Sequence, residues 1–276
     1  MSAKRKKIPR RSFRTSLGAR WLVFLIALAA LTGTGYYYRS ALRFYYFKIR
    51  GETEKELRLH DIRNFEVLSA HRNFSAGIDV SEYQGKINWH QVDSIAEMFP
   101  IDFVYIRASA GKDRPDRAYA ENYQGARKAG FICGAYHYYR PDENSLEQAN
   151  LFIKTVKRSF GDLPPVLDIE QLPESQPVDS LRMGVRRWLT MVEKHYGIRP
   201  VIYTGEKFYE DFLKEEFGDN YVFWIANYNF TENQIGSREI WQFTEKGLVP
   251  GIIGRVDVNL YNGNLRQLLQ LTKSTR

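Results

Sequence analysis

Two carboxylates separated by a single residue, Asp168 and Glu170, follow a short apolar run that begins after the double proline at 164–165. If residues 166–170 form a strand, both acids lie on one face, with Cα atoms about 6.5 Å apart, while Leu167 and Ile169 pack behind them. Two acids held that close repel each other, so one should keep its proton near neutral pH. A protonated acid beside an ionised one can cleave a glycosidic bond. The alternative is that these acids cap a helix or lie solvated in a loop.

The elements that must position the two acids are apolar runs that alternate with amphipathic segments from Gly77 onward. About eight strands, mostly separated by helices, predict an α/β fold: a single irregular (β/α) barrel with fewer than eight outer helices. The predicted strands are 77–81, 103–109, 131–139, 166–170, 201–204, 222–226, 240–243 and 255–259.

Two further acids lie in the first and last of these strands, Asp79 in 77–81 and Asp257 in 255–259. The first and last strands of a closed barrel are neighbours, so Asp79 and Asp257 should lie side by side. The chemistry of such barrels gathers at the C-terminal ends of the strands. Because burying like charges costs free energy, four converging acids favour a functional site over a stabilising device.

Aromatic side chains gather in the same predicted strands. Tyr138 lies near the end of the third strand, Tyr203 in the fifth, Trp224 in the sixth, and Trp241-Gln242 in the seventh. Tyr and Trp rings stack on sugar rings, and their polar tips bond to hydroxyl groups. Alternate members of each run must belong to the core, so only some of them should contact a ligand.

The N-terminal segment differs from the rest of the chain in composition. Residues 1–50 contain 12 of the 40 Lys and Arg and none of the 32 Asp and Glu. Residues 51–276 therefore carry 28 basic and 32 acidic residues, a net charge of −4, although the whole chain has +8. Residues 51–276 thus lack the excess of positive charge that is typical of a nucleic-acid-binding domain.

We predict a basic cytoplasmic tail over 1–20, a transmembrane signal anchor over 21–38, a stem over 39–73 and the barrel over 74–276. The uncharged stretch 21–38 is at the short end of what spans a bilayer, and its basic flank should stay in the cytoplasm. The barrel would then lie on the outer, periplasmic or extracellular side of the cytoplasmic membrane. The alternatives are secretion after cleavage near Ala27-Leu28-Ala29 and a basic nucleic-acid-binding arm.

Metal and cofactor chemistry find no support in the sequence. The five histidines show no metal-ligand spacing, and no glycine-rich phosphate loop follows a strand. The one cysteine, Cys133, lies in an apolar run, where a buried structural thiol is expected. His137, near the barrel mouth, is expected to be a hydrogen-bonded strand histidine. We predict no metal and no cofactor.

Eight ordered motifs together resemble one known family. They are Gly77-Ile78-Asp79-Val80-Ser81 with Gln84-Gly85, Tyr105-Ile106-Arg107-Ala108-Ser109, Gly134-Ala135-Tyr136-His137-Tyr138, Leu167-Asp168-Ile169-Glu170, Ile202-Tyr203-Thr204, Trp224-Ile225-Ala226, Trp241-Gln242-Phe243 and Val256-Asp257-Val258-Asn259. In this order they resemble the family 25 glycoside hydrolases, the Chalaropsis-type lysozymes, over roughly residues 74–271.

The resemblance implies an N-acetylmuramidase that cuts the β-1,4 bond between N-acetylmuramic acid and N-acetylglucosamine in peptidoglycan. It implies Glu170 as the general acid/base, Asp168 as the residue that orients the substrate's 2-acetamido group, and Asp79 and Asp257 as supporting acids. The substrate-binding residues that we expect are Arg107, Tyr138, Tyr203, Trp224 and Gln242. Retention through the acetamido group is favoured over a covalent enzyme ester, because no fifth carboxylate stands out as a nucleophile.

Two other functions are compatible with parts of this pattern. A chitinase-like hydrolase also ends a strand with Asp-x-Glu, but the further acids expected upstream are missing here. A catalytically silent glycan-binding module tethered to the membrane would retain the aromatic side chains without needing all four acids.

Overall fold

The computed structural model describes residues 54–229 and 239–273. The predicted membrane segment over 21–38 lies outside these residues. Within the two described ranges, no helix is both long enough and apolar enough to cross a bilayer.

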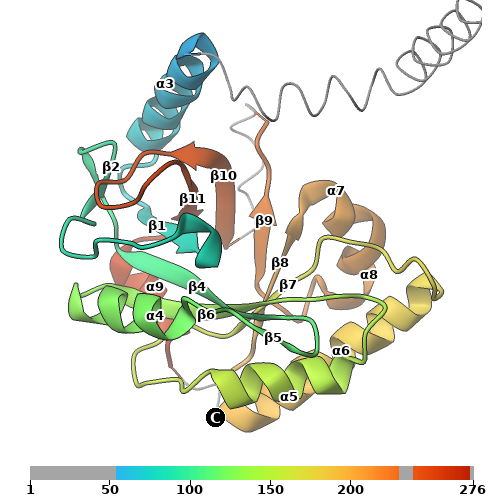
Figure 1. The fold of residues 1–276 in the computed structure, drawn as a ribbon. Coiled ribbons are helices and arrows are strands. Elements are labelled where there is room, and N and C mark those ends of the chain that lie inside the picture. Colours follow the sequence, from blue (N-terminus) through green and yellow to red (C-terminus); the bar gives the residue numbers. More distant parts are fainter. Residues whose placement is uncertain (1–53, 230–238, 274–276) are drawn as a thin grey trace, which may run out of the picture. The chain divides into compact units, whose positions relative to one another are not determined.

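A closed barrel is the centre of the described fold (Figure 1). Its strands are β1 (Ser75–Val80), β4 (Phe103–Ala110), β6 (Ile132–Tyr138), β7 (Val166–Asp168), β8 (Val201–Gly205), β9 (Phe223–Ala226), β10 (Ile240–Gly247) and β11 (Val256–Tyr261). The barrel closes because β1 pairs with both β4 and β11. The short β5 (Arg114–Pro115) extends β4, and β2 (Ser94–Ile95) pairs with β3 (Phe99–Pro100). The prediction of an α/β barrel is confirmed.

Helices cover the outside of the barrel unevenly. They are α3 (Glu54–Ala70), α4 (Tyr119–Lys128), α5 (Ser145–Thr155), α6 (Val178–Tyr196), α7 (Glu206–Phe208), α8 (Lys214–Phe217) and α9 (Leu265–Leu271), with a 3₁₀ turn η1 (Glu82–Gln84) and a π-helical turn η2 (Tyr209–Leu213). Figure 1 shows α4 beside β4 and β6, and α5 beside α6. The last strands, β10 and β11, are instead joined by a loop, so that part of the barrel has no helix between its strands.

Alternation along the strands separates two apolar clusters. Leu167 of β7 and Ile202 of β8 belong to the larger cluster, together with Trp188 of α6, so these side chains point outward toward the helices. Their sequence neighbours Val166 and Val201 belong to the other cluster, which therefore fills the barrel interior. That interior floor consists of residues near the N-terminal ends of the parallel strands, such as Phe103, Val166, Val201 and Ile240.

Strand β11 runs antiparallel to both of its neighbours, whereas every other neighbouring pair in the closed barrel is parallel. The sequence analysis placed Asp257 at the mouth from the rule for C-terminal strand ends, although it is the second residue of β11. In a parallel strand that position would lie at the opposite end of the barrel. The reversal brings the start of β11 to the mouth and makes Asp257 the Cα partner of Asp79.

Helix α3 lies within the stretch predicted as a stem, and its C-terminal half contacts the barrel. Leu68 is buried, Asn64 Nδ2 donates to Lys246 O at 3.1 Å, and Asp61 forms an ion pair with Arg255. The compact unit that contains the barrel accordingly begins at Leu57.

One glycine in the barrel wall provides a test of this packing. Gly134 is the Cα partner of Tyr105, and an added Cβ would overlap the buried Tyr105 ring. We expect Gly134→Ala to lower the free energy of unfolding by about 1–3 kcal/mol, because the ring would have to shift inside a packed interior. Urea unfolding measures the change. Gly205→Ala is the matched control, because among the described residues no atom beyond its chain neighbours lies within 4 Å of its added Cβ, and its φ of −70° suits any residue. Equal effects of the two substitutions would contradict the packing described here.

Candidate active site

An open pocket of about 330 Å³ lies where the parallel strands end. All nine side chains that the sequence analysis selected line it: Asp79, Asp168, Glu170, Asp257, Arg107, Tyr138, Tyr203, Trp224 and Gln242. The structure therefore brings together residues from β1, β4, β6, β7, β8, β9, β10 and β11 and from the segment after β7. Their individual roles stay predictions.

The Asp168–Glu170 pair lies at the end of β7. The strand ends at Asp168, two residues earlier than predicted, but Ile169 N still donates to Tyr203 O at 2.9 Å. Leu167 and Ile169 are fully buried behind the pocket, as expected. The alternation of faces thus continues past the strand, and both acids line the pocket.

Burial and mutual repulsion shift the ionisation of this pair. Burial raises the pKa of Asp168 well above its ordinary value, and the charges of Glu170 and Asp79 raise it further. Burial, followed by the charge of Asp79, also raises the pKa of Glu170, although a hydrogen bond with Tyr203 acts in the opposite direction. The pair therefore retains a proton at a pH where two exposed carboxyls would be ionised.

Asp79 and Asp257 form a second carboxyl pair. They are Cα partners across β1 and β11, and both line the pocket. Burial raises the pKa of Asp79 to about 6, against hydrogen bonds that lower it. Burial and the charge of Asp79 raise the pKa of Asp257 to about 9. Between these values Asp79 is ionised and Asp257 is neutral.

Neutral donors, instead of cations, satisfy Asp79. Its Oδ2 accepts from Asn259 Nδ2 at 2.8 Å and from Gln242 Nε2 at 3.0 Å. Gln242 Oε1 accepts in turn from the hydroxyl of Tyr203 at 2.9 Å, and Asn259 Oδ1 accepts from Trp224 Nε1 at 2.8 Å. These bonds fix the orientation of both amides, so that each presents an N–H to Asp79.

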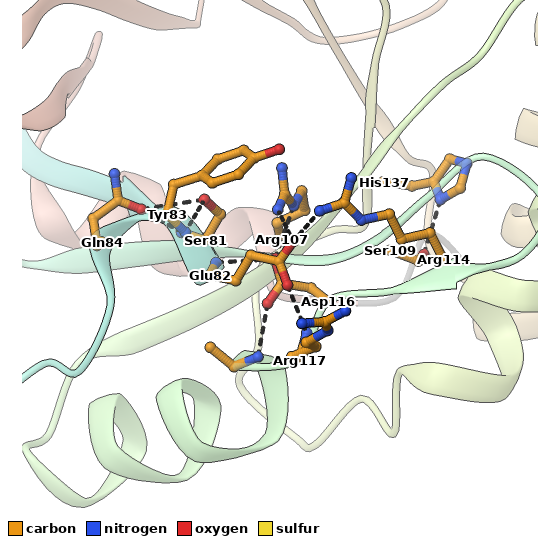
Figure 2. Close-up of polar contacts among 11 residues, drawn as sticks. Ser81, Glu82, Tyr83, Gln84, Arg107, Ser109, Arg114, Asp116, Arg117 and His137 are labelled. Carbon is orange, nitrogen blue, oxygen red and sulfur yellow. Dashed lines mark hydrogen bonds and ion pairs between the residues drawn. The ribbon is translucent and has the colours of Figure 1, made fainter.

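The predicted sugar-binding residues differ in how much surface they offer. Trp224 is 2% exposed and Tyr203 is 9% exposed, so both form the pocket wall more than a stacking surface. Tyr138, the last residue of β6, is half-buried. Arg107 lines the pocket while its Nε donates to Asp116 Oδ2 at 2.8 Å (Figure 2).

The sequence analysis missed several residues of the pocket: Tyr83, Tyr228, Glu245 and, behind Asp79, Asn259. Asn259 could have been found, because it lies two residues after Asp257 and hence on the same face of the strand. Tyr228 donates to Gln242 Oε1 at 2.6 Å from the segment after β9. Glu245 is a fifth carboxylate at the rim, half-exposed and 3.1 Å from Lys246 Nζ. Glu245 therefore adds to the pocket lining a carboxylate that the sequence analysis did not select.

The remaining candidates for chemistry are structural. His137 is fully buried, its pKa is lowered by burial to about 4, and it contacts Ser109 Oγ at 2.9 Å and Gln148 Oε1 at 3.1 Å. Cys133 is a buried free thiol. In the part of the chain that the structure describes, no group of three or more His, Cys, Asp or Glu is arranged to hold a metal ion.

Comparisons with known proteins show which family and which solved structures this chain resembles. The family described as Glycosyl hydrolases family 25 matches residues 78–252. Lysozyme M1 of Streptomyces globisporus is 34% identical over 214 residues, which cover 72% of this chain and 71% of that protein. YegX of Escherichia coli O6:H1 is 32% identical over 263 residues, which cover 94% of this chain and 93% of that protein. The crystal structure of the bacterial lysozyme from Streptomyces coelicolor superposes with a TM-score of 0.64 at 29% identity, covering 72% of this chain and 96% of that one.

The linked titrations of the four acids provide a test of the site. We expect Asp79→Asn to lower the pKa of Glu170, Asp168 and Asp257, because the charge of Asp79 raises all three. The difference should be largest above about pH 6, where Asp79 is ionised. NMR titration of the side-chain carboxyl carbons measures it, with the exposed Asp93→Asn as control. Unchanged carboxyl titrations in Asp79→Asn would contradict the electrostatic coupling.

Proposed function

Because the chain belongs to family 25 of the glycosyl hydrolases, we propose that it is a retaining muramidase of peptidoglycan. The family assignment makes it a glycoside hydrolase of the lysozyme type. The bond that we propose it hydrolyses is the β-1,4 bond between N-acetylmuramic acid and N-acetylglucosamine.

The observation that carries this proposal is the convergence of Glu170 and Asp168 with Asp79 and Asp257 in one open pocket. Glycoside hydrolysis needs a proton donor for the leaving oxygen and a group that stabilises the developing positive charge at the anomeric carbon. Glu170 suits the first role, because burial and the Asp79 charge keep its pKa raised. After donating its proton, the carboxylate can activate the water that completes hydrolysis.

Asp168 suits the second role. Its Oδ1 is buried and has no hydrogen-bond partner among the described residues. A substrate 2-acetamido N–H is a donor that would satisfy it, and an unsatisfied buried acceptor costs about 1–3 kcal/mol. Accepting that hydrogen bond would also lower the pKa of Asp168 and leave the proton of the pair on Glu170. Asp168 would then orient the acetamido oxygen toward the anomeric carbon.

The second carboxyl pair supports the first. An ionised Asp79 raises the pKa of Glu170, while a neutral Asp257 can donate a hydrogen bond to sugar or water. Glu245 is the alternative nucleophile for a covalent enzyme ester, but its half-exposed position and its ion pair with Lys246 favour a solvated rim residue. Acetamido participation therefore stays the mechanism that we propose.

The proposal places the barrel on the outer side of the cytoplasmic membrane, held by residues 21–38. The argument is the uncharged stretch after eight Lys and Arg residues. Peptidoglycan lies outside the cytoplasm, so this orientation would bring the pocket to its substrate.

Substitution of the general acid tests the function. Purified full-length protein should release fragments with reducing N-acetylmuramic acid ends from isolated peptidoglycan, as identified by mass spectrometry. Glu170→Gln should lower the rate by at least about 10²–10⁴-fold, because the amide cannot donate a proton to the leaving oxygen. The matched control is Glu215→Gln on α8, at an exposed position.

Four results would overturn parts of this assignment or support an alternative. Near-normal turnover by Glu170→Gln would remove the residue from its role. Reducing N-acetylglucosamine ends would change the bond that is cut. Binding to peptidoglycan without any released fragment would instead support the glycan-binding module considered above. Cleavage of chitin but not of peptidoglycan would support a chitinase-like hydrolase.

A separate measurement tests the anchor. We expect the full-length chain to stay with membranes after an alkaline carbonate wash, and deletion of residues 21–38 to release it, because the deleted segment is the uncharged stretch. Mass spectrometry of the intact protein distinguishes the alternative: a mature chain that begins near residue 30 would show cleavage and contradict the anchor.

A further inference from the structure

Tyr83 is a large side chain at the pocket whose position burial does not explain. It belongs to η1, the turn directly after β1, and it lines the pocket that holds the four acids. Its side chain is nevertheless 72% exposed. An exposed aromatic ring that lines a pocket offers a flat surface on which a ligand can stack.

The backbone that carries Tyr83 is held by three hydrogen bonds (Figure 2). Ser81 N donates to Gln84 Oε1 at 2.7 Å, and Tyr83 N donates to Ser81 Oγ at 3.2 Å, which together form a capping box. Glu82 N donates to Asp116 Oδ2 at 3.0 Å. The turn is therefore fixed both within itself and to the segment after β5, without help from the Tyr83 side chain.

A cation lies against one face of the ring. The guanidinium carbon of Arg107 is 4.5 Å from the centroid of the Tyr83 ring, and Figure 2 shows the two groups side by side. The same guanidinium is fixed at its edge by Asp116 Oδ2, 2.8 Å from Nε, and by Glu82 Oε1, 3.3 Å from an Nη. An arginine held in this way stacks on an aromatic ring in a single orientation.

The two arginines beside Tyr83, Arg107 and Arg114, are balanced in charge by Asp116 and Glu82, which argues against an anionic ligand. Asp116, whose side chain is fully buried, and Glu82 offset the charge of Arg107, and Glu82 also pairs with Arg114. Although burial acts to raise the pKa of Glu82, the hydrogen bond and charge of Arg114 lower it below its ordinary value, so this carboxylate is ionised. A carboxylate of a peptide stem would therefore meet an arginine that is already neutralised.

We propose that Tyr83 is a stacking surface for a pyranose ring of the glycan strand, at a subsite next to the acids, and that Arg107 is the positioning residue that holds it. The inference rests on the muramidase function proposed above. An uncharged pyranose presents a flat C–H face that packs against an aromatic ring. The ring face not covered by Arg107 is the surface available for it, and fixing the ring beforehand lowers the entropy cost of binding.

Steady-state kinetics on soluble, uncross-linked peptidoglycan strands test the proposal with the full-length protein. We expect Tyr83→Ala to raise KM about tenfold, with the pH dependence of kcat unchanged, because a contact to a sugar is lost while the acids stay in place. Tyr83→Phe should recover most of the loss, because it keeps the ring. The control is Phe160→Ala, which removes a fully exposed aromatic side chain that does not line the pocket.

A double-variant cycle tests the role of Arg107. Arg107→Lys keeps the charge that Asp116 and Glu82 require but loses the planar group that stacks on the ring. If Arg107 acts through Tyr83, this change should raise KM severalfold in the wild type and by less than about twofold in the Tyr83→Ala background. If the KM increases of the two single variants instead multiply in the double variant, Arg107 contacts the substrate independently, and its positioning role is overturned.

Failure of the Tyr83 stacking subsite and failure of the proposed muramidase function would give different results. A KM for Tyr83→Ala within about twofold of the wild type, or a loss confined to kcat, would overturn the stacking subsite while the wild-type protein still released muramic acid ends. Absence of those ends from the wild-type digest would instead overturn the muramidase proposal.

Discussion

Burial of carboxyl groups above an apolar floor is the constraint on which the site depends. Side chains alternate along each barrel strand, so Val166 and Asp168 lie on the same face of β7, and Val201 and Tyr203 on the same face of β8. The valines lie deeper in the barrel interior, and Asp168 and Tyr203 lie nearer the mouth. An acid in this place loses hydration, and its neutral form becomes favoured. The same geometry that closes the barrel therefore raises the pKa of these acids through burial, and the charge of Asp79 raises the pKa of Asp168, Glu170 and Asp257 further.

Neutral hydrogen-bond donors satisfy Asp79 in place of a cation, so the pKa values of the neighbouring acids stay raised. Asp79 is satisfied by the amides of Gln242 and Asn259, which are themselves oriented by aromatic hydroxyl and indole groups. A cation at the same place would lower the pKa of the neighbouring acids. Arg107 is the basic residue of the pocket lining, and its guanidinium is committed to Asp116 and Glu82 at the rim.

Periodicity along the sequence was sufficient to select the acids and the strands that carry them. It could not show that β11 is reversed, because an alternating pattern is the same in both directions. Glu245 escaped notice because register shifts in β10, between Gln242 and Thr244 and again before Gly247, break the simple alternation of faces. Tyr83 escaped because its contact with Arg107, and the bond from Glu82 N to Asp116, involve residues from other parts of the chain.

The raised pKa values of Asp79 and Asp257 have a consequence for the stability of the folded state. Asp79 and Asp257 bind protons more tightly in the folded chain than in the unfolded chain, where carboxyls titrate near pH 4. A group with a raised folded pKa stabilises the fold fully below its unfolded pKa and loses that contribution as pH rises through the folded value. From about pH 4 to about pH 9 these two residues thus make the native state progressively less stable. These two acids of the pocket thus favour the folded barrel at acidic pH and weaken that contribution at alkaline pH.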